Sequence, residues 1–197
     1  MNFVAHQLLS FDNPQLQIGN LLGETVKGKQ YLAFPSDIQR GILLHRTIDT
    51  FTDSHEIVKK SSHYFHSTQH KFAPIVIDVV YDYFLIKHWN KFSTISFNQF
   101  KHDCYQLFQN EYESFPEKLQ EIIFYLLKHD WFNNYSTKEG IQRTLKGIGS
   151  RTIYKNNLNH ILPEFEEFYT ELEQEFLTFF PLLLTHCKSF IPIQTTE

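Results

Sequence analysis

The sequence is poor in cysteine and has no long apolar run. Its two cysteines, Cys104 and Cys187, are too few for a disulfide framework and have no CxxC spacing, so we expect a reducing compartment, the cytoplasm. The longest apolar stretch, residues 177–184, is interrupted by a threonine and a proline and is too short to cross a bilayer. Residues 1–9 lack the basic start of a signal peptide. We therefore expect a soluble cytoplasmic protein that does not act at a membrane.

Turn-forming residues are also scarce. Seven glycines and seven prolines among 197 residues fall well below average usage, which is roughly 12% for the two together. Apolar residues recur at helical spacing almost everywhere, and strand-like alternation is nearly absent. The sequence therefore predicts an all-α, single-domain bundle of about eight helices over residues 1–197. We expect these helices at residues 2–9, 14–26, 36–53, 55–66, 71–89, 97–115, 117–132 and 158–190.

An excess of positive charge is missing as well. Eighteen basic and 22 acidic residues give a net charge of −4, which argues against binding to the bare phosphate backbone of a nucleic acid. The charge is uneven along the chain. Residues 138–155 hold five basic residues and one acid, whereas residues 164–175 hold six glutamates and no base. We expect an anionic partner to approach the basic stretch, although such a stretch can also be a simple solvated face.

Six ionisable residues occur on otherwise apolar faces of four predicted helices. Burying an unpaired carboxylate is costly, so such groups need a cation beside them. Arg40, Arg46 or Lys71 could supply it, or the groups could face water. Alternatively, three Asp, one Glu and two His suit a divalent ion, with Mn²⁺ or Fe²⁺ more natural than Zn²⁺. The six candidate metal ligands are His6, Glu24, His45, Asp49, Asp78 and Asp82.

Several short motifs resemble the acyl carrier protein phosphodiesterase family. The likeness spans most of the chain and is densest over the first ninety residues. The motifs are Asn2-Phe3-Val4-Ala5-His6, Gly19-Asn20-Leu21-Leu22, Val26-Lys27-Gly28, Gly41-Ile42, His45-Arg46, Ile48-Asp49, Thr52-Asp53, Ala73-Pro74, Asp78, Tyr81-Asp82, Phe84-Leu85 and His88-Trp89, with a weaker likeness at residues 147–151.

This resemblance implies an all-helical relative of the HD phosphohydrolases that depends on Mn²⁺, with Fe²⁺ or Mg²⁺ as alternatives. It implies removal of 4′-phosphopantetheine from holo-acyl carrier protein, and no nucleic-acid or membrane partner. In such a reaction the metal would activate a water that attacks phosphorus. Arg46 or Arg151 could neutralise the phosphoryl oxygens, and His88 is a candidate general acid.

One residue departs from the family pattern. The family has Asp where this sequence has Glu24, which keeps a carboxylate but extends it by one methylene. A ligand moved in this way could change activity, metal choice or substrate. Two other hypotheses therefore stay open: a metal phosphohydrolase for a nucleotide or another small phosphoester, and a non-catalytic helical binding module of the same fold.

Overall fold

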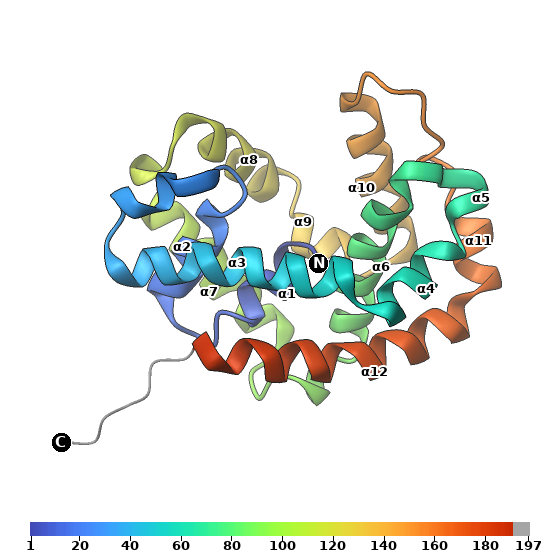
Figure 1. The fold of residues 1–197 in the computed structure, drawn as a ribbon. Helices are drawn as coiled ribbons and strands as arrows, with labels where there is room; N and C mark the ends of the chain where they lie inside the picture. The colour runs from blue at the N-terminus through green and yellow to red at the C-terminus, as the bar shows by residue number, and fades with distance from the viewer. Residues whose placement is uncertain (191–197) are drawn as a thin grey trace.

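The computed structural model describes residues 1–190, and every regular element within them is helical (Figure 1). The α-helices are α1 (Phe3–Leu8), α2 (Pro14–Leu22), α3 (Ser36–Ser54), α4 (Glu56–His63), α5 (His66–Gln69), α6 (Ala73–Lys87), α7 (Phe97–Asn110), α8 (Glu117–Lys128), α9 (Trp131–Asn134), α10 (Lys138–Arg151), α11 (Leu162–Glu167) and α12 (Tyr169–Cys187). Four 3₁₀ helices lie between them, η1 (Gly28–Ala33), η2 (His70–Phe72), η3 (Trp89–Lys91) and η4 (Tyr112–Ser114), and a fifth, η5 (Lys188–Phe190), follows α12.

The prediction of an all-α fold is confirmed, because residues 1–190 contain no strand. None of the described helices is both long and apolar enough to cross a membrane. The last seven residues of the predicted domain lie outside the described residues.

The helix predictions were wrong at three places. The single helix expected over 117–132 is divided into α8 and α9, because Asp130 between them has a left-handed backbone conformation. Helix α10 was missed because its three glycines lower helix propensity, yet the Thr137 hydroxyl caps its first turn and Ile141 and Leu145 bury its inner face. The single helix expected over 158–190 begins only at Leu162 and breaks at Phe168, whose ring stacks on Tyr64 at 4.5 Å.

Helix α6 occupies the centre of a continuous hydrophobic core. Its residues Val76, Ile77, Val80 and Phe84 are fully buried. Helix α12 runs along one side of the molecule, while α8 and α10 rise apart from each other on the opposite side (Figure 1). An apolar pattern that covers nearly the whole circumference of α6 predicts this central position.

Helices α2 and α3 cross at a pair of glycines. A Cβ on Gly19 would lie 2.3 Å from the carbonyl oxygen of Ile38, and a Cβ on Gly41 would lie 2.5 Å from that of Leu16. Larger residues would force the helices apart. This close crossing brings Asn20, the residue after Gly19, against the face of α3.

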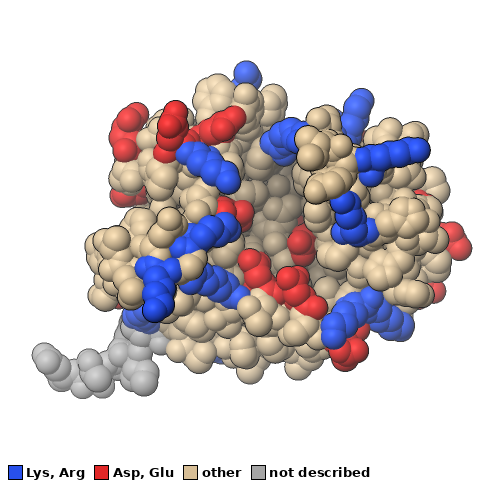
Figure 2. All heavy atoms as spheres, turned by 45° about the horizontal axis from the view of Figure 1, so that its top comes forward, with Lys and Arg blue, Asp and Glu red and all other residues tan. Residues whose placement is uncertain are grey.

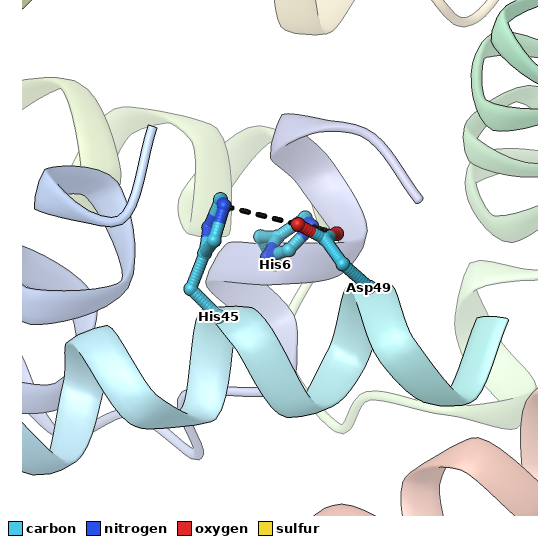
Figure 3. A group of neighbouring side chains, drawn as sticks. All are labelled: His6, His45 and Asp49. Carbon is cyan, nitrogen blue, oxygen red and sulfur yellow. Dashed lines mark hydrogen bonds and ion pairs between the residues drawn. The ribbon is translucent and has the colours of Figure 1, made fainter. Parts of the chain in front are cut away.

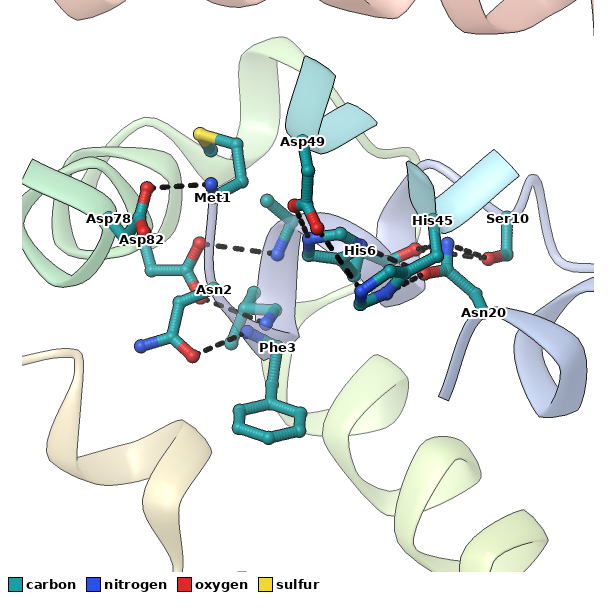
Figure 4. Close-up of polar contacts among 12 residues, drawn as sticks. Met1, Asn2, Phe3, His6, Ser10, Asn20, His45, Asp49, Asp78 and Asp82 are labelled. Carbon is teal, nitrogen blue, oxygen red and sulfur yellow. Dashed lines mark hydrogen bonds and ion pairs between the residues drawn. The ribbon is translucent and has the colours of Figure 1, made fainter. Parts of the chain in front are cut away.

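Two carboxylates of α6 hold the start of α1 in place (Figure 4). Asp82 accepts backbone hydrogen bonds from Val4 at 2.9 Å and Ala5 at 3.3 Å, while Asp78 pairs with the amino group of Met1 at 2.7 Å. A helix of six residues is too short to be stable alone, so α1 depends on these contacts. They fix the direction in which α1 presents its next turn.

Candidate metal centre

Helices α1 and α3 bring together His6, His45 and Asp49 (Figure 3). Among residues 1–190 this is the only group of three or more possible ligands whose ligand atoms all lie within 4.8 Å of one another. Nε2 of His6 lies 3.1 Å from Oδ1 of Asp49, and Nε2 of His45 lies 3.2 Å from Oδ2. The two imidazole centroids are 4.4 Å apart.

The group combines two buried ligands with one that reaches solvent. The side chains of His6 and His45 are 4% and 8% exposed, whereas that of Asp49 is 43% exposed. Gly23 lets His45 pack this closely, since a Cβ there would lie 2.3 Å from Cγ of the imidazole. An ion held by these three residues would be shielded on one side and open on the other.

Asn20, fully buried on α2, orients both imidazoles (Figure 4). Its amide nitrogen donates to the carbonyl oxygen of His6 at 2.8 Å and to the Ser10 hydroxyl at 3.0 Å. The amide oxygen must therefore face the rings, and it lies 2.8 Å from Nδ1 of His6 and 3.2 Å from Nδ1 of His45. Because an amide oxygen only accepts, both Nδ1 atoms carry the hydrogen.

This arrangement creates a site for positive charge. A neutral imidazole that donates from Nδ1 has a lone pair on Nε2, and both Nε2 atoms face a carboxylate. Lone pairs and a carboxylate repel one another unless protons or a metal ion lie between them. Two imidazole nitrogens and carboxylate oxygens form a donor set that fits Mn²⁺ or Fe²⁺, and an outer partner on Nδ1 is typical of metal-binding histidines.

The contacts between the imidazoles and the Asp49 carboxylate also shift the pKa values of the group. Burial would lower the pKa of His6, but the hydrogen bond and charge of Asp49 outweigh burial and raise it. Burial would raise the pKa of Asp49, but hydrogen bonds from His45 and His6 hold it well below its usual range. Without a metal, the carboxylate of Asp49 therefore favours the protonated form of the His6 imidazole.

The other three predicted ligands lie outside this group of three. Asp78 and Asp82 contact the start of α1, and burial raises the pKa of Asp82 to about 7 despite the nearby amino group of Met1. Glu24 is partly buried, and its side chain makes no hydrogen bond or ion pair with a described residue, yet its charge acts on His6. Glu24 therefore stays a candidate for a further ligand.

The three predicted catalytic residues are spread over the molecule. Arg46 donates to the carbonyl oxygen of Val26 at 3.2 Å and lines a separate recess beside Phe51. His88 follows α6 and pairs with Glu173 of α12 at 2.6 Å, so the geometry does not bring it to the metal ligands. Arg151, at the end of α10, lines a different cavity.

That cavity has a volume of about 760 Å³ and lies between the start of α1 and helices α8, α9 and α10. Phe3 lines it, one helical turn before His6. The space-filling view shows acidic side chains on the floor of a hollow in the surface and lysine and arginine side chains on both of its sides (Figure 2). An anionic ligand would thus meet positive charge at the edges before it reached the floor.

The sequence predicted no role for Asn20, because that role depends on the crossing of α2 and α3, which no local pattern encodes. Of the cavity lining, only Arg151 was predicted to act in catalysis. Phe3 stands in one of the family motifs without a predicted role, and Trp131 is one aromatic residue in a chain with 16% of them.

Comparisons with known proteins find one family that matches nearly the whole chain. The family model described as acyl carrier protein phosphodiesterase matches residues 1–183. A protein of that name from Photorhabdus laumondii subsp. laumondii is 30% identical over 190 residues, which cover 96% of each chain. One from Escherichia coli O157:H7 is 32% identical over 190 residues, covering 95% of this chain and 98% of its own. No solved structure matches.

Proposed function

Because this chain belongs to the acyl carrier protein phosphodiesterase family, we propose that it is a hydrolase that releases 4′-phosphopantetheine from holo-acyl carrier protein in the cytoplasm. In this reaction an oxygen of water bonds to phosphorus and the bond from phosphorus to the carrier serine oxygen breaks. The serine oxygen takes up a proton, so the products are apo-acyl carrier protein and 4′-phosphopantetheine.

The observation that carries the proposal is the group of His6, His45 and Asp49 oriented by Asn20. These three ligands would hold one divalent ion, which the family resemblance implies is Mn²⁺, with Fe²⁺ or Mg²⁺ as alternatives. Glu24 is a further candidate carboxylate ligand. A divalent ion bound there would act as a Lewis acid toward a phosphoryl oxygen and lower the pKa of water.

The chain's own residues would supply orientation and charge. Asn20 keeps the hydrogen of each imidazole on Nδ1, so that both Nε2 atoms stay available as ligands. Asp78 and Asp82 would not bind the ion. They would act indirectly, because they hold α1 in place and thereby fix the position of His6. Arg151 is the better placed of the two candidate arginines to neutralise phosphoryl oxygens, because it lines the cavity that begins at Phe3. His88 receives no role, since it is paired with Glu173.

Charge supports a protein substrate. Acyl carrier proteins are acidic, and the basic stretch over residues 138–155 forms α10 and the segment after it, beside the cavity. Lysine and arginine side chains on both sides of the hollow would steer an acidic protein toward it (Figure 2). The acidic stretch over residues 164–175 belongs to α11 and α12, and α12 runs along the opposite side of the molecule (Figure 1).

The test compares two substrates with Mn²⁺-loaded protein. Holo-acyl carrier protein should lose the mass of its phosphopantetheine group, and His45→Ala should abolish that loss. A small aryl phosphodiester should be cleaved far more slowly. Cleavage of the small ester with the carrier protein left intact would support the alternative phosphohydrolase. Failure of both reactions by protein that binds the ion would overturn catalysis and support a binding module.

A further inference from the structure

The cavity beside α10 has the size and lining of a small-molecule site. Its volume of about 760 Å³ falls in the usual range for such sites, roughly 300–1,000 Å³. Ile122 and Tyr125 come from α8, Trp131 from α9 and Ile148 from α10, so apolar side chains from three helices face it. The side chains that line the cavity indicate which kind of ligand could bind there.

Aromatic rings and a guanidinium form one wall. The rings of Phe3 and Trp131 lie with their centroids 5.6 Å apart, and the guanidinium carbon of Arg151 lies 5.8 Å from the centroid of the Trp131 ring. Rings of this kind bind methyl and methylene groups, and an arginine beside them can pair with a phosphate. The wall therefore suits a ligand that is apolar along its length and anionic at one end.

Polar side chains line the cavity as well as apolar ones. Asn2, Asn134 and Ser150 are among its lining residues. Side-chain amides and hydroxyls can bind amides of a ligand, which a plain hydrocarbon chain lacks. The lining therefore favours a ligand with amide groups along an apolar chain.

The cavity adjoins the metal ligands. Phe3 and His6 are one turn apart on α1, about 4.5 Å along the helix axis. Tyr135, which also lines the cavity, is buried, and the charges of Asp82 and Glu24 help to raise its pKa. One end of the cavity thus lies beside the carboxylates around the metal ligands, and the other lies beside Ile122 and Tyr125 on α8.

We propose that this cavity binds the pantetheine arm of the substrate, with the phosphate end toward His6 and the thiol end toward α8. This assignment rests on the proposed function and adds to it the place where the arm lies. The two amides and the hydroxyl of pantetheine match the polar lining of Asn2, Asn134 and Ser150, and its methyl and methylene groups match Phe3 and Trp131.

Gly147 allows the cavity to be filled without a clash. It lines the cavity, and a Cβ on it would meet no atom within 4 Å. Gly147→Trp should therefore occupy the site, and Trp has the better helix propensity, so α10 should not be weakened. Glu139→Trp is the matched control, because it adds the same side chain to an exposed position of the same helix outside the cavity.

Binding of 4′-phosphopantetheine and of pantetheine would be measured by calorimetry with Mn²⁺-loaded full-length protein. Parent and Glu139→Trp should bind both, and Gly147→Trp should weaken binding at least tenfold while keeping its metal content and melting temperature. Equal binding by parent and Gly147→Trp would overturn the assignment, as would absence of binding by the parent. Failure of the proposed function would differ, since the parent would bind these compounds yet leave holo-carrier protein uncleaved.

Discussion

The side-chain oxygen of Asn20 lies 2.8 Å from Nδ1 of His6, and this contact decides which nitrogen of the imidazole can bind a metal. The same oxygen lies 3.2 Å from Nδ1 of His45. One buried amide on α2 thus fixes the tautomer of two histidines on two other helices and leaves both Nε2 atoms facing Asp49.

Removing this amide should weaken metal binding without removing a ligand. Asn20→Leu keeps the shape of the side chain but lacks the acceptor, so both imidazoles can change tautomer. We expect Mn²⁺ affinity to fall by about 10- to 100-fold. Titration calorimetry measures this, and His45→Ala gives the value for loss of a ligand. An affinity equal to that of the parent would mean that Asn20 has only a packing role.

Metal affinity should rise with pH. The pKa of His6 is raised because the hydrogen bond and charge of Asp49 outweigh burial. The metal requires the neutral imidazole, so binding must release the proton that the metal-free protein holds. Below the raised pKa affinity therefore falls as pH falls, and well above it the dependence disappears. Calorimetry in two buffers of different ionisation enthalpy counts the protons. Binding without proton release below that pKa would contradict the proposed site.

Mn²⁺ affinity should distinguish the carboxylates that bind the ion from those that only hold α1 in place. Asp49→Asn and Glu24→Gln remove negative charge at the metal ligands, and we expect each to lower Mn²⁺ affinity at least tenfold, or about 1.4 kcal/mol. Asp82→Asn keeps an oxygen that can accept the hydrogen bond from Val4. It should therefore change metal affinity by less than threefold. Titration calorimetry of the three variants measures these Mn²⁺ affinities. A tenfold loss in Asp82→Asn would mean that Asp82 is a metal ligand.

Reversing the charge of Arg143 and Lys146 on α10 should weaken the encounter with the carrier protein and leave the metal site unchanged. Arg143 and Lys146 are exposed and contact no metal ligand. Arg143→Glu with Lys146→Glu should raise the dissociation constant for apo-acyl carrier protein and flatten its salt dependence, because steering by opposite charge is lost. Metal content should stay the same. Lys118→Glu, exposed on α8 outside the cavity, is the control. Unchanged affinity and salt response would leave α10 as a solvated face.

Helical periodicity predicted the fold class and the placement of His45 and Asp49 on one face of α3, because steps of four residues are local. It also predicted a cation near Asp78, but the cation in contact with Asp78 is the amino group of Met1, 77 residues away in the sequence. A contact of that kind depends on the packing of α1 against α6. The crossing at Gly19 and Gly41 is equally non-local, and so is the role of Asn20. Sequence patterns therefore indicated which residues are unusual but not which of them meet.

The proposed site requires that His6, His45 and Asp49 hold one divalent ion. Pulsed electron paramagnetic resonance of protein loaded with one equivalent of Mn²⁺ can show this, because ¹⁴N couplings report coordinated imidazole nitrogens. We expect coupling from two imidazoles in the parent, from one in His45→Ala and from one in His6→Ala. Bound Mn²⁺ without nitrogen coupling, or with coupling unchanged in both variants, would contradict it.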